Sequence, residues 1–307
     1  MSQPTLTIAS ANLLNFLAPP NAYYQFDNIY EREQWQEKCR WTQAQLRELD
    51  ADMIGFQEVF SADECQRLCQ AIGYPFFATV DTPHVESDYI YSQPVVALAS
   101  RYPITQVSGL ESQRLDALPA SFTPFSRTPL FATVDVPLFG NVAVYVCHLK
   151  SQRPMDDQDD PIMARWLSHQ QRGQEAVMLR LLANRQYQKE PMPTLLVGDF
   201  NQSLDSSITQ ALVDNPSTEL DALALKDCWQ QRLQAPSERR ATHYHFAKGN
   251  VLDYILCSQE FDPAHPRSVA TLIDYRVCDQ HLVNPIYERD RQASDHAFIA
   301  ATFAMAL

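Results

Sequence analysis

Short apolar runs bounded by polar residues, proline or glycine recur along the chain, which is the pattern of buried β-strands. Residues 195–197 are Leu-Leu-Val, followed by Gly198, so a buried strand delivers Asp199 and Asn201 at its end. Gly140-Asn141 separates two other runs and predicts a hairpin turn. The expected strands are residues 6–12, 52–56, 95–99, 130–136, 142–147, 195–198, 252–256, 269–275 and 297–303.

Other segments have the composition or spacing of helices. Asp160-Pro161 supplies an N-cap and a first-turn proline for a long helix, and Gly73 ends a shorter one. The expected helices are residues 31–49, 62–72, 162–188 and a segment around 206–213. Residues 104–126 have no clear period and are expected to form turns and an irregular excursion.

Strands mixed with helices, some of them joined by hairpins, favour mixed sheets over a purely parallel sheet. The chain contains no repeat, no low-complexity linker and no shift in composition. We therefore expect residues 1–307 to form a single α/β domain.

Composition narrows the possible partners and the compartment. The net charge is −13 and no Lys/Arg run exists, which disfavours tight nonspecific binding to long nucleic acid. An acidic chain can still act on phosphates if a divalent cation brings the positive charge. The seven scattered cysteines indicate reduced thiols, and neither a signal peptide nor a transmembrane segment is evident. The expected compartment is the cytoplasm, and no protein partner is predicted.

Polar residues of the types used in catalysis recur at or beside the ends of the predicted strands. They are Asn12, Glu58, His148, Asp199, Asn201, Asp253, Asp295 and His296. Each of them alone is more often a turn former, a helix cap or a satisfied core residue. Their joint placement weakens that explanation and predicts a functional site.

Metal-assisted hydrolysis of phosphoesters is the chemistry that these residues suit. Asn12, Glu58 and Asp295 offer hard oxygen ligands without a thiolate cluster, which favours Mg²⁺ or Mn²⁺ over structural zinc. Two neutral donors, His148 and Asn201, are candidates to hold the nonbridging oxygens.

A histidine paired with a carboxylate fixes its tautomer and adjusts a proton-transfer group. His296 with Asp253 is the predicted pair, and Asp199 supplies an acceptor or a base. The segment 243–246 precedes the 252–256 strand; lining of the substrate side by this segment is the less favoured alternative, and it is not included in the predicted site.

At these residues the sequence resembles the endonuclease/exonuclease/phosphatase superfamily, which includes deoxyribonuclease I, AP endonucleases, inositol polyphosphate 5-phosphatases and neutral sphingomyelinases. The ordered matches span nearly the whole chain. They are Ala11-Asn12-Leu13-Leu14-Asn15, Gly55-Phe56-Gln57-Glu58-Val59, His148-Leu149-Lys150-Ser151, Gly198-Asp199-Phe200-Asn201, Leu252-Asp253-Tyr254-Ile255-Leu256 and Ser294-Asp295-His296.

The resemblance implies a deoxyribonuclease I-like fold, a four-layer α/β sandwich of two mixed β-sheets flanked by helices. It implies that Glu58 is the principal metal ligand, with Asn12 and Asp295 near it. It also implies that Asp199 and Asn201 contact the attacking water and the phosphate.

In the same resemblance Asp253 orients His296, and either Asp199 or His296 activates the water. The chain departs from AP endonucleases at two positions, because it has His148 in place of their tyrosine and Leu14 in place of an aspartate. Abasic-site repair is therefore not expected. Val251 replaces an arginine often found there, which leaves any phosphate contact of that arginine unsupported.

The predicted function is a phosphoester hydrolase dependent on Mg²⁺ (or Mn²⁺), of the phosphodiesterase or nuclease type. Its partner would be a phosphodiester or other phosphorylated substrate, nucleic acid included. An alternative is a phosphatase or sphingomyelinase-like phospholipase for a small phosphorylated substrate, which the charge of −13 makes attractive. A third class, a non-catalytic binding protein, is disfavoured because every expected polar residue is present.

Overall fold

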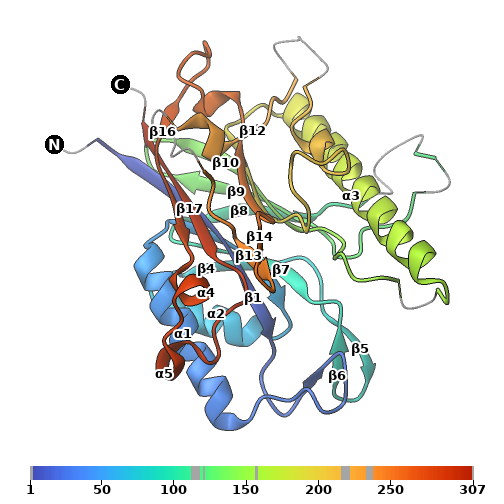
Figure 1. Cartoon of the computed structure of the whole chain (residues 1–307). Helices are drawn as coiled ribbons and strands as arrows, with labels where there is room; N and C mark the ends of the chain where they lie inside the picture. The colour runs from blue at the N-terminus through green and yellow to red at the C-terminus, as the bar shows by residue number, and fades with distance from the viewer. Residues whose placement is uncertain are drawn as a thin grey trace.

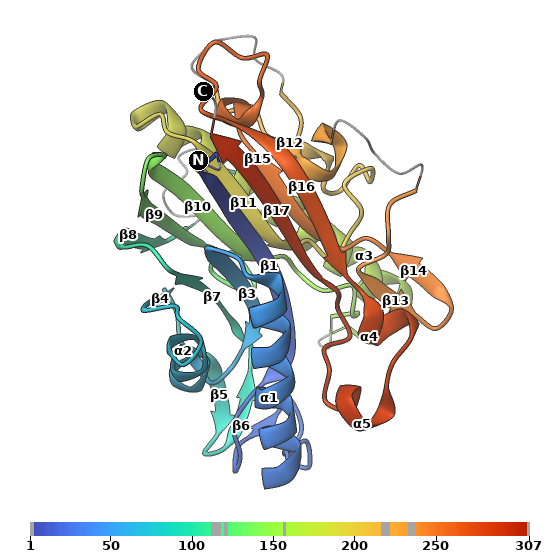
Figure 2. The same cartoon turned by 90° about the vertical axis from the view of Figure 1, so that its left-hand side faces the viewer.

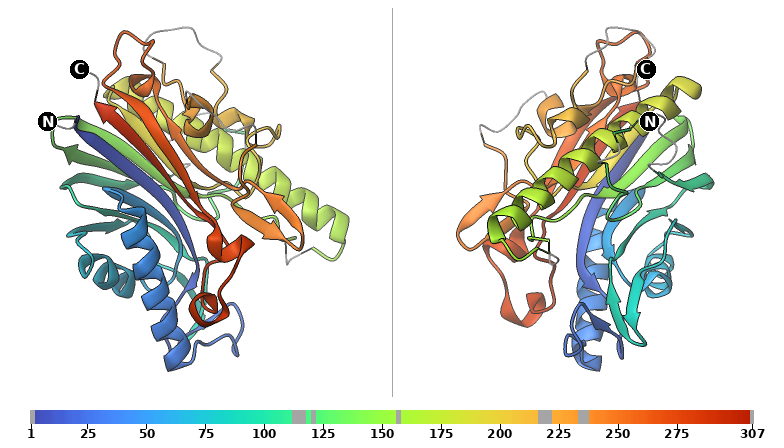
Figure 3. Two further views of the ribbon diagram at one scale, coloured as in Figure 1. Left: turned by 60° about the vertical axis from the view of Figure 1, so that its left-hand side comes forward. Right: turned by 90° about the vertical axis from the view of Figure 1, so that its right-hand side faces the viewer.

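Two six-stranded β-sheets pack face to face, and helices cover the outer face of each sheet (Figures 1 and 3). The computed structural model describes residues 3–111, 118–119, 122–155, 158–215, 222–232 and 238–305. The architecture is the predicted four-layer α/β sandwich of the deoxyribonuclease I type, with mixed sheets.

The first sheet has the strand order β16-β17-β1-β3-β7-β4. Its members are β16 (Ala270–Cys278), β17 (Phe298–Met305), β1 (Thr5–Phe16), β3 (Met53–Val59), β7 (Val95–Ser100) and β4 (Phe76–Thr79). Strand β1 runs parallel to β3 and antiparallel to β17. The first and last strands of the chain are therefore neighbours at the centre of this sheet.

The second sheet has the order β12-β15-β11-β10-β9-β8. Its members are β12 (Lys226–Asp227), β15 (Asp253–Cys257), β11 (Thr194–Asp199), β10 (Gly140–His148), β9 (Leu130–Val136) and β8 (Ile104–Gly109). β9 and β10 form a hairpin as predicted, but its turn lies at residues 137–139 and not at Gly140-Asn141, because these two residues already pair with β9. β10 and β11 are parallel, and β15 runs antiparallel to β11.

Helices α1 (Arg32–Leu49) and α2 (Ala62–Gln70) lie on the first sheet, and α3 (Pro161–Lys189) lies on the second (Figure 1). The Asp160 carboxylate caps α3 as predicted, because it accepts from the amides of Ile162 and Met163 at 2.9 Å. No helix in these described ranges is both long enough and apolar enough to cross a bilayer.

Smaller elements decorate the ends of the two sheets. A hairpin of β13 (His243–His245) and β14 (Lys248–Asn250) lies at the same end of the molecule as α4 (Gln280–Val283) (Figure 2). The remainder are β2 (Ala22–Tyr23), β5 (His84–Ser87), β6 (Ile90–Ser92), α5 (Tyr287–Asp290) and the 3₁₀ helices Gln210–Leu212, Cys228–Gln231 and Gln259–Phe261.

Side-chain alternation along the strands separates the core into three apolar layers. In β1, Leu6 and Ile8 face the opposite sheet, whereas Ala9 and Ala11 face the helices α1 and α2. Both faces of the central strands are thus buried, which explains why their sequences read as continuous apolar runs.

Two further predictions about local structure were wrong. Residues 104–109 of the expected irregular excursion form the edge strand β8, whose outer face is exposed, so that its sequence lacks a continuous apolar run. Residues 112–117 and 120–121 of that excursion lie outside the described part. The expected helix at 206–213 is only a 3₁₀ turn at Gln210–Leu212, because side chains such as Thr209, which donates to the Ser203 carbonyl at 2.6 Å, compete with helical hydrogen bonding.

Gly198→Ala is expected to destabilise the protein by about 3 kcal/mol. A Cβ at Gly198 would lie 2.1 Å from the carbonyl oxygen of Cys147 on the paired strand β10, and neither backbone can move without breaking that pairing. Denaturant unfolding measures the change. Gly173→Ala on α3 is the matched control, since its Cβ would meet Ile208 at an ordinary 3.6 Å, and a gain of about 0.5 kcal/mol is expected. Equal stability of both variants would contradict the packing explanation.

Candidate active site

The strand ends of the two sheets meet at one edge and bring the predicted residues together there. Across the second sheet, His148 is in register with Asp199, and Asp199 is in register with Asp253. Across the first sheet, β1 carries Asn12 beside the end of β3, where Glu58 lies. The site is therefore built from both sheets, with the second supplying three side chains in adjacent rows.

The Asp199 carboxylate is the meeting point of the two sheets. It is 1% exposed, and Asn12 donates from Nδ2 to its Oδ2 at 3.1 Å. Nε2 of His148 lies 3.5 Å from the same oxygen, and Nε2 of His296 lies 3.7 Å from it. Burial raises the pKa of Asp199 to about 7, and nearby Asp253 and Glu58 add to the rise against the attraction of His296.

His296 is fixed by a hydrogen bond between its Nδ1 and Oδ2 of Asp253 at 2.8 Å. Burial by itself would lower the pKa of His296, but attraction to Asp253 and Asp199 outweighs it and holds that pKa well above the ordinary value. The predicted pair is present, and the two neighbouring carboxylates favour the protonated form of His296.

His148 is held in the opposite protonation state. Its ring is 3% exposed, and burial, together with the charges of Arg127 and His296, lowers its pKa well below the ordinary value. The two histidines beside Asp199 are thus shifted in opposite directions, the pKa of His148 downward and that of His296 upward.

Asn12 and Glu58 form a second cluster next to Asp199. Nδ2 of Asn12 lies 3.3 Å from Oε1 of Glu58, and Oε2 of Glu58 accepts from the amide of Asn15 at 2.9 Å. Leu14, Asn15, Glu58 and Asn201 all have φ between 51° and 60°. Left-handed backbone at non-glycine residues costs about 1–3 kcal/mol each and tends to gather at functional sites.

Asn201 is held by hydrogen bonds to its own strand end and to the residue that follows β10. Its amide nitrogen donates to Oδ1 of Asp199 at 2.8 Å, and its side-chain Nδ2 donates to the Leu149 carbonyl at 2.9 Å. One Nδ2 hydrogen remains for another acceptor, because a carboxamide carries two.

Asp295 lies toward a different neighbour from the one expected. Its side chain is half exposed, with Oδ2 3.8 Å from Nε2 of His243. Within the described residues, no hydrogen bond or ion pair joins Asp295 to Asn12 or Glu58. Both carboxylates nevertheless act on the buried Lys38, because Glu58 and Asp295 each raise its pKa by electrostatic attraction. The two carboxylates therefore border one region.

Several residues of the site escaped the sequence reasoning. Ser294 donates to the Asn12 carbonyl at 2.7 Å and accepts from the His296 amide at 3.0 Å, tying the chain end to β1. Thr242 Oγ1 accepts from the Asp253 amide at 3.1 Å. The ring of His243 lies on that of His296, with centroids 4.9 Å apart. None of them was assigned to the site, although Ser294 lies in the matched Ser294-Asp295-His296 segment and His243 in the segment 243–246. Lys38 also gave a signal, as a cation next to the apolar stripe of α1.

Lys38 is a buried cation, 1% exposed, whose Nζ lies 5.6 Å from the centroid of the Tyr30 ring. Burial lowers its pKa to about 8, while Glu58 and Asp295 oppose that change. A lysine is rarely enclosed without a carboxylate in direct contact, because removing an ammonium from water is costly. The region between Glu58 and Asp295 therefore attracts positive charge, and its oxygen donors fit a hard divalent cation.

Lys38→Met is expected to tighten the binding of Mn²⁺ about fivefold. The substitution removes the ammonium group, which repels a cation bound at the carboxylates, at almost constant side-chain volume. Titration calorimetry at pH 7 measures the change. Lys226→Met is the matched control, since Lys226 pairs with Asp262 at 2.6 Å on β12 and should leave Mn²⁺ affinity unchanged. Unchanged or weaker binding in Lys38→Met would contradict the electrostatic role.

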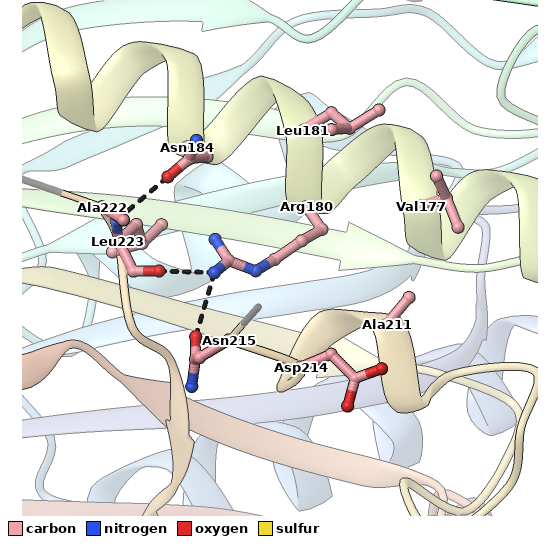
Figure 4. A pocket seen from close by; sticks show the side chains of 9 residues that line it. All are labelled: Val177, Arg180, Leu181, Asn184, Ala211, Asp214, Asn215, Ala222 and Leu223. Atoms are coloured by element: carbon pink, nitrogen blue, oxygen red, sulfur yellow. Dashed lines mark hydrogen bonds between the residues drawn. The ribbon is translucent and has the colours of Figure 1, made fainter. Parts of the chain in front are cut away.

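A hollow of about 260 Å³ lies elsewhere, between α3 and the segments that contain Ala211 and Leu223 (Figure 4). Arg180 of α3 crosses it and donates to Oδ1 of Asn215 at 3.0 Å and to the Leu223 carbonyl. None of the predicted site residues lines this hollow. It is therefore separate from the candidate active site.

The chain belongs to the Endonuclease/Exonuclease/phosphatase family, whose model matches residues 39–296. Enzymes of this family are phosphoester hydrolases that use divalent metals, which supports the prediction that the protein is a phosphoester hydrolase. A search of curated proteins found no match.

Solved structures share the fold over nearly the whole chain. The catalytic domain of human Nocturnin, with a bound sulfate anion, is 18% identical, with a TM-score of 0.62 and coverage of 99% of this chain and 96% of that chain. D. rerio TDP2 complexed with single-strand DNA product is 17% identical (TM-score 0.60; coverage 97% and 98%). A mannosyl-6-phosphatase from Bacteroides thetaiotaomicron is 16% identical (TM-score 0.61; coverage 98% and 100%).

Proposed function

We propose that the protein is a phosphodiesterase dependent on Mg²⁺ or Mn²⁺. The observation that carries the proposal is the buried Asp199 carboxylate, with Asn12, His148 and His296 from two sheets directed at one of its oxygens. Such a convergence is costly in an apolar interior unless a ligand uses it. Hydrolysis of a phosphate ester is the chemistry that these groups suit together.

In this proposal Asp199 is the general base. A base must be unprotonated and should have a pKa near the working pH, which fits Asp199 with its pKa of about 7. His296 is held protonated by Asp253 and Asp199, and so it supplies positive charge rather than accepting a proton. The water oxygen attacks phosphorus, its proton passes to Asp199, the ester P–O bond breaks, and the leaving oxygen takes a proton from solvent.

His148 and Asn201 hold the nonbridging oxygens of the phosphate. His148 is neutral, so it donates one hydrogen bond without adding a positive charge beside the metal site. Asn201 has a second amide hydrogen available. Glu58, with Asn12 and Asp295, would hold a divalent cation, which when bound polarises the phosphoryl oxygen and offsets its negative charge.

A substrate screen tests the proposal. It contains Mg²⁺ or Mn²⁺ at about 5 mM, a concentration chosen to saturate a site that holds its cation weakly. The substrates are DNA, RNA, bis(p-nitrophenyl) phosphate and phosphate monoesters. We expect diester cleavage that Glu58→Gln abolishes and that His245→Asn, on the exposed part of the β13–β14 hairpin, leaves unchanged. Absence of any hydrolysis, or full activity in Glu58→Gln, would refute the proposal.

A phosphatase for a small phosphorylated substrate is the second candidate. The net charge of −13 favours it, because a long polyanion is repelled by an acidic protein. The similarity of fold to a mannosyl-6-phosphatase is compatible with it. Release of inorganic phosphate from monoesters, with diesters untouched, would replace the first candidate by the second.

A further inference from the structure

His243 on β13 has no part in the proposed hydrolysis, yet it lies directly against the site. Its backbone forms an isolated β-bridge with His296, and the Thr242 carbonyl accepts from the Ala297 amide at 2.7 Å. These contacts hold the imidazole rings of His243 and His296 together at 4.9 Å between centroids. The buried Nδ1 of His243 has no hydrogen-bond partner among the described residues, whereas its Nε2 lies 3.8 Å from Oδ2 of Asp295.

These three residues have the spacing of a metal-binding cluster. One ligand atom each from His243, Asp295 and His296 lie within 4.8 Å of one another. Ligands bound to one ion at about 2.0–2.2 Å are at most about 4.4 Å apart, so a small side-chain rotation closes the set. Asp295 is half exposed, which gives an ion and its remaining waters access from solvent.

The donor types of this cluster differ from those around Glu58. Two imidazoles and one carboxylate suit zinc and neighbouring transition metals, whereas carboxylate and amide oxygens suit Mg²⁺. His296 also has the outer partner typical of a metal-ligating histidine, because its Nδ1 is hydrogen-bonded to Asp253 at 2.8 Å. Its Nε2 is thereby the nitrogen directed away from Asp253 and available to an ion.

We propose that His243, Asp295 and His296 form a second metal site that binds Zn²⁺. Binding there occupies Nε2 of His296, the nitrogen that faces Asp199, and takes up the carboxylate of Asp295, which the proposed Mg²⁺ site also uses. Zn²⁺ is therefore an inhibitor of the Mg²⁺-dependent reaction. The inhibition rests on the proposed function, but the binding does not.

Titration calorimetry with Zn²⁺, together with the visible absorption of Co²⁺ as a zinc substitute, tests the site without measuring activity. His243→Asn is expected to weaken Zn²⁺ binding at least about tenfold, as loss of one ligand or its support does. His245→Asn, from the same hairpin, and Glu58→Gln should bind Zn²⁺ as the unaltered chain does. Buried cysteines are a competing ligand source, and only the His243 site predicts a dependence on His243.

A Zn²⁺ affinity that His243→Asn leaves unchanged would overturn the site. Loss of Zn²⁺ binding in Glu58→Gln would also overturn it, because the ion would then lie at the other cluster.

Inhibition is measured separately, as the Zn²⁺ concentration that halves Mg²⁺-dependent hydrolysis. We expect that concentration to rise at least about tenfold in His243→Asn, in proportion to the affinity. Zn²⁺ binding that depends on His243 but leaves hydrolysis unchanged would overturn the inhibition alone. If the protein hydrolysed no ester, the calorimetry would still decide the site.

Discussion

Asp199→Asn is expected to lower kcat/KM for the best phosphodiester about 10³-fold, because the amide cannot accept the proton of the attacking water. Asparagine matches aspartate in shape and still accepts from Asn12, which lies 3.1 Å from the carboxylate. Steady-state kinetics at saturating Mg²⁺ measures the loss. Activity within tenfold of the unaltered enzyme would exclude Asp199 as the base.

The same variant should change the pH dependence of stability in the metal-free protein. The pKa of Asp199 is raised from 3.8 to about 7 by burial, so the native state binds an extra proton between these values. Stability conferred by the protonated carboxyl is present at low pH and is lost as pH rises toward 7. Asp199→Asn avoids that loss and should gain, relative to the unaltered chain, about 2–3 kcal/mol between pH 5 and pH 8. Parallel pH profiles from urea unfolding would contradict this.

Asp253→Asn should reduce kcat/KM about 10²–10³-fold, through the protonation of His296. Asp253 holds the ring at 2.8 Å and, against the effect of burial, raises the pKa of His296. With a neutral partner that pKa falls, so the ratio of the activity at pH 6 to the activity at pH 8 should be higher than in the unaltered enzyme. The pH profile separates this role from a structural one, since a merely loosened site would lose activity equally at both values.

Asp262→Asn is the matched control for this second variant, because Asp262 pairs with Lys226 at 2.6 Å away from the site. It should retain the activity and the pH profile of the unaltered enzyme. Circular dichroism and unfolding curves are to check that Asp253→Asn is folded. We expect it to fold, because the contact of Thr242 with the backbone amide of residue 253 does not depend on the side chain. An unchanged pH profile in Asp253→Asn would remove the proposed control of His296.

The chain pattern by itself determined the buried strands, the long helix α3 and its Asp160 cap. These features depend on local rules, such as side-chain alternation along strands and the capping of free amides at helix ends. The sequence also placed His148 and Asp199 at the ends of buried strands and Asp253 beside the start of another, and an antiparallel strand brings its start to the same edge of the sheet. Their register across three adjacent strands agrees with that placement.

Only the tertiary structure decided which residues surround these strand ends. Lys38 reaches the carboxylates from a helix, and His243 lies on His296 because a hairpin bridges residues 53 positions apart. Edge strand β8 and the 3₁₀ turn after β11 likewise depend on neighbours, through pairing with β9 and through side-chain hydrogen bonds. Long-range pairing and burial set such contacts and the pKa values that follow from them.

Asp199 illustrates the division between the two levels. Its position at the end of a buried strand follows from Leu-Leu-Val-Gly in the sequence. Its pKa of about 7 follows from burial beneath the opposite sheet and from Asp253 and His296 beside it. The sequence therefore determined that a carboxylate stands at this edge, and the packing of two sheets decided that it is poised to exchange a proton near neutral pH, because desolvation is a property of the assembled core.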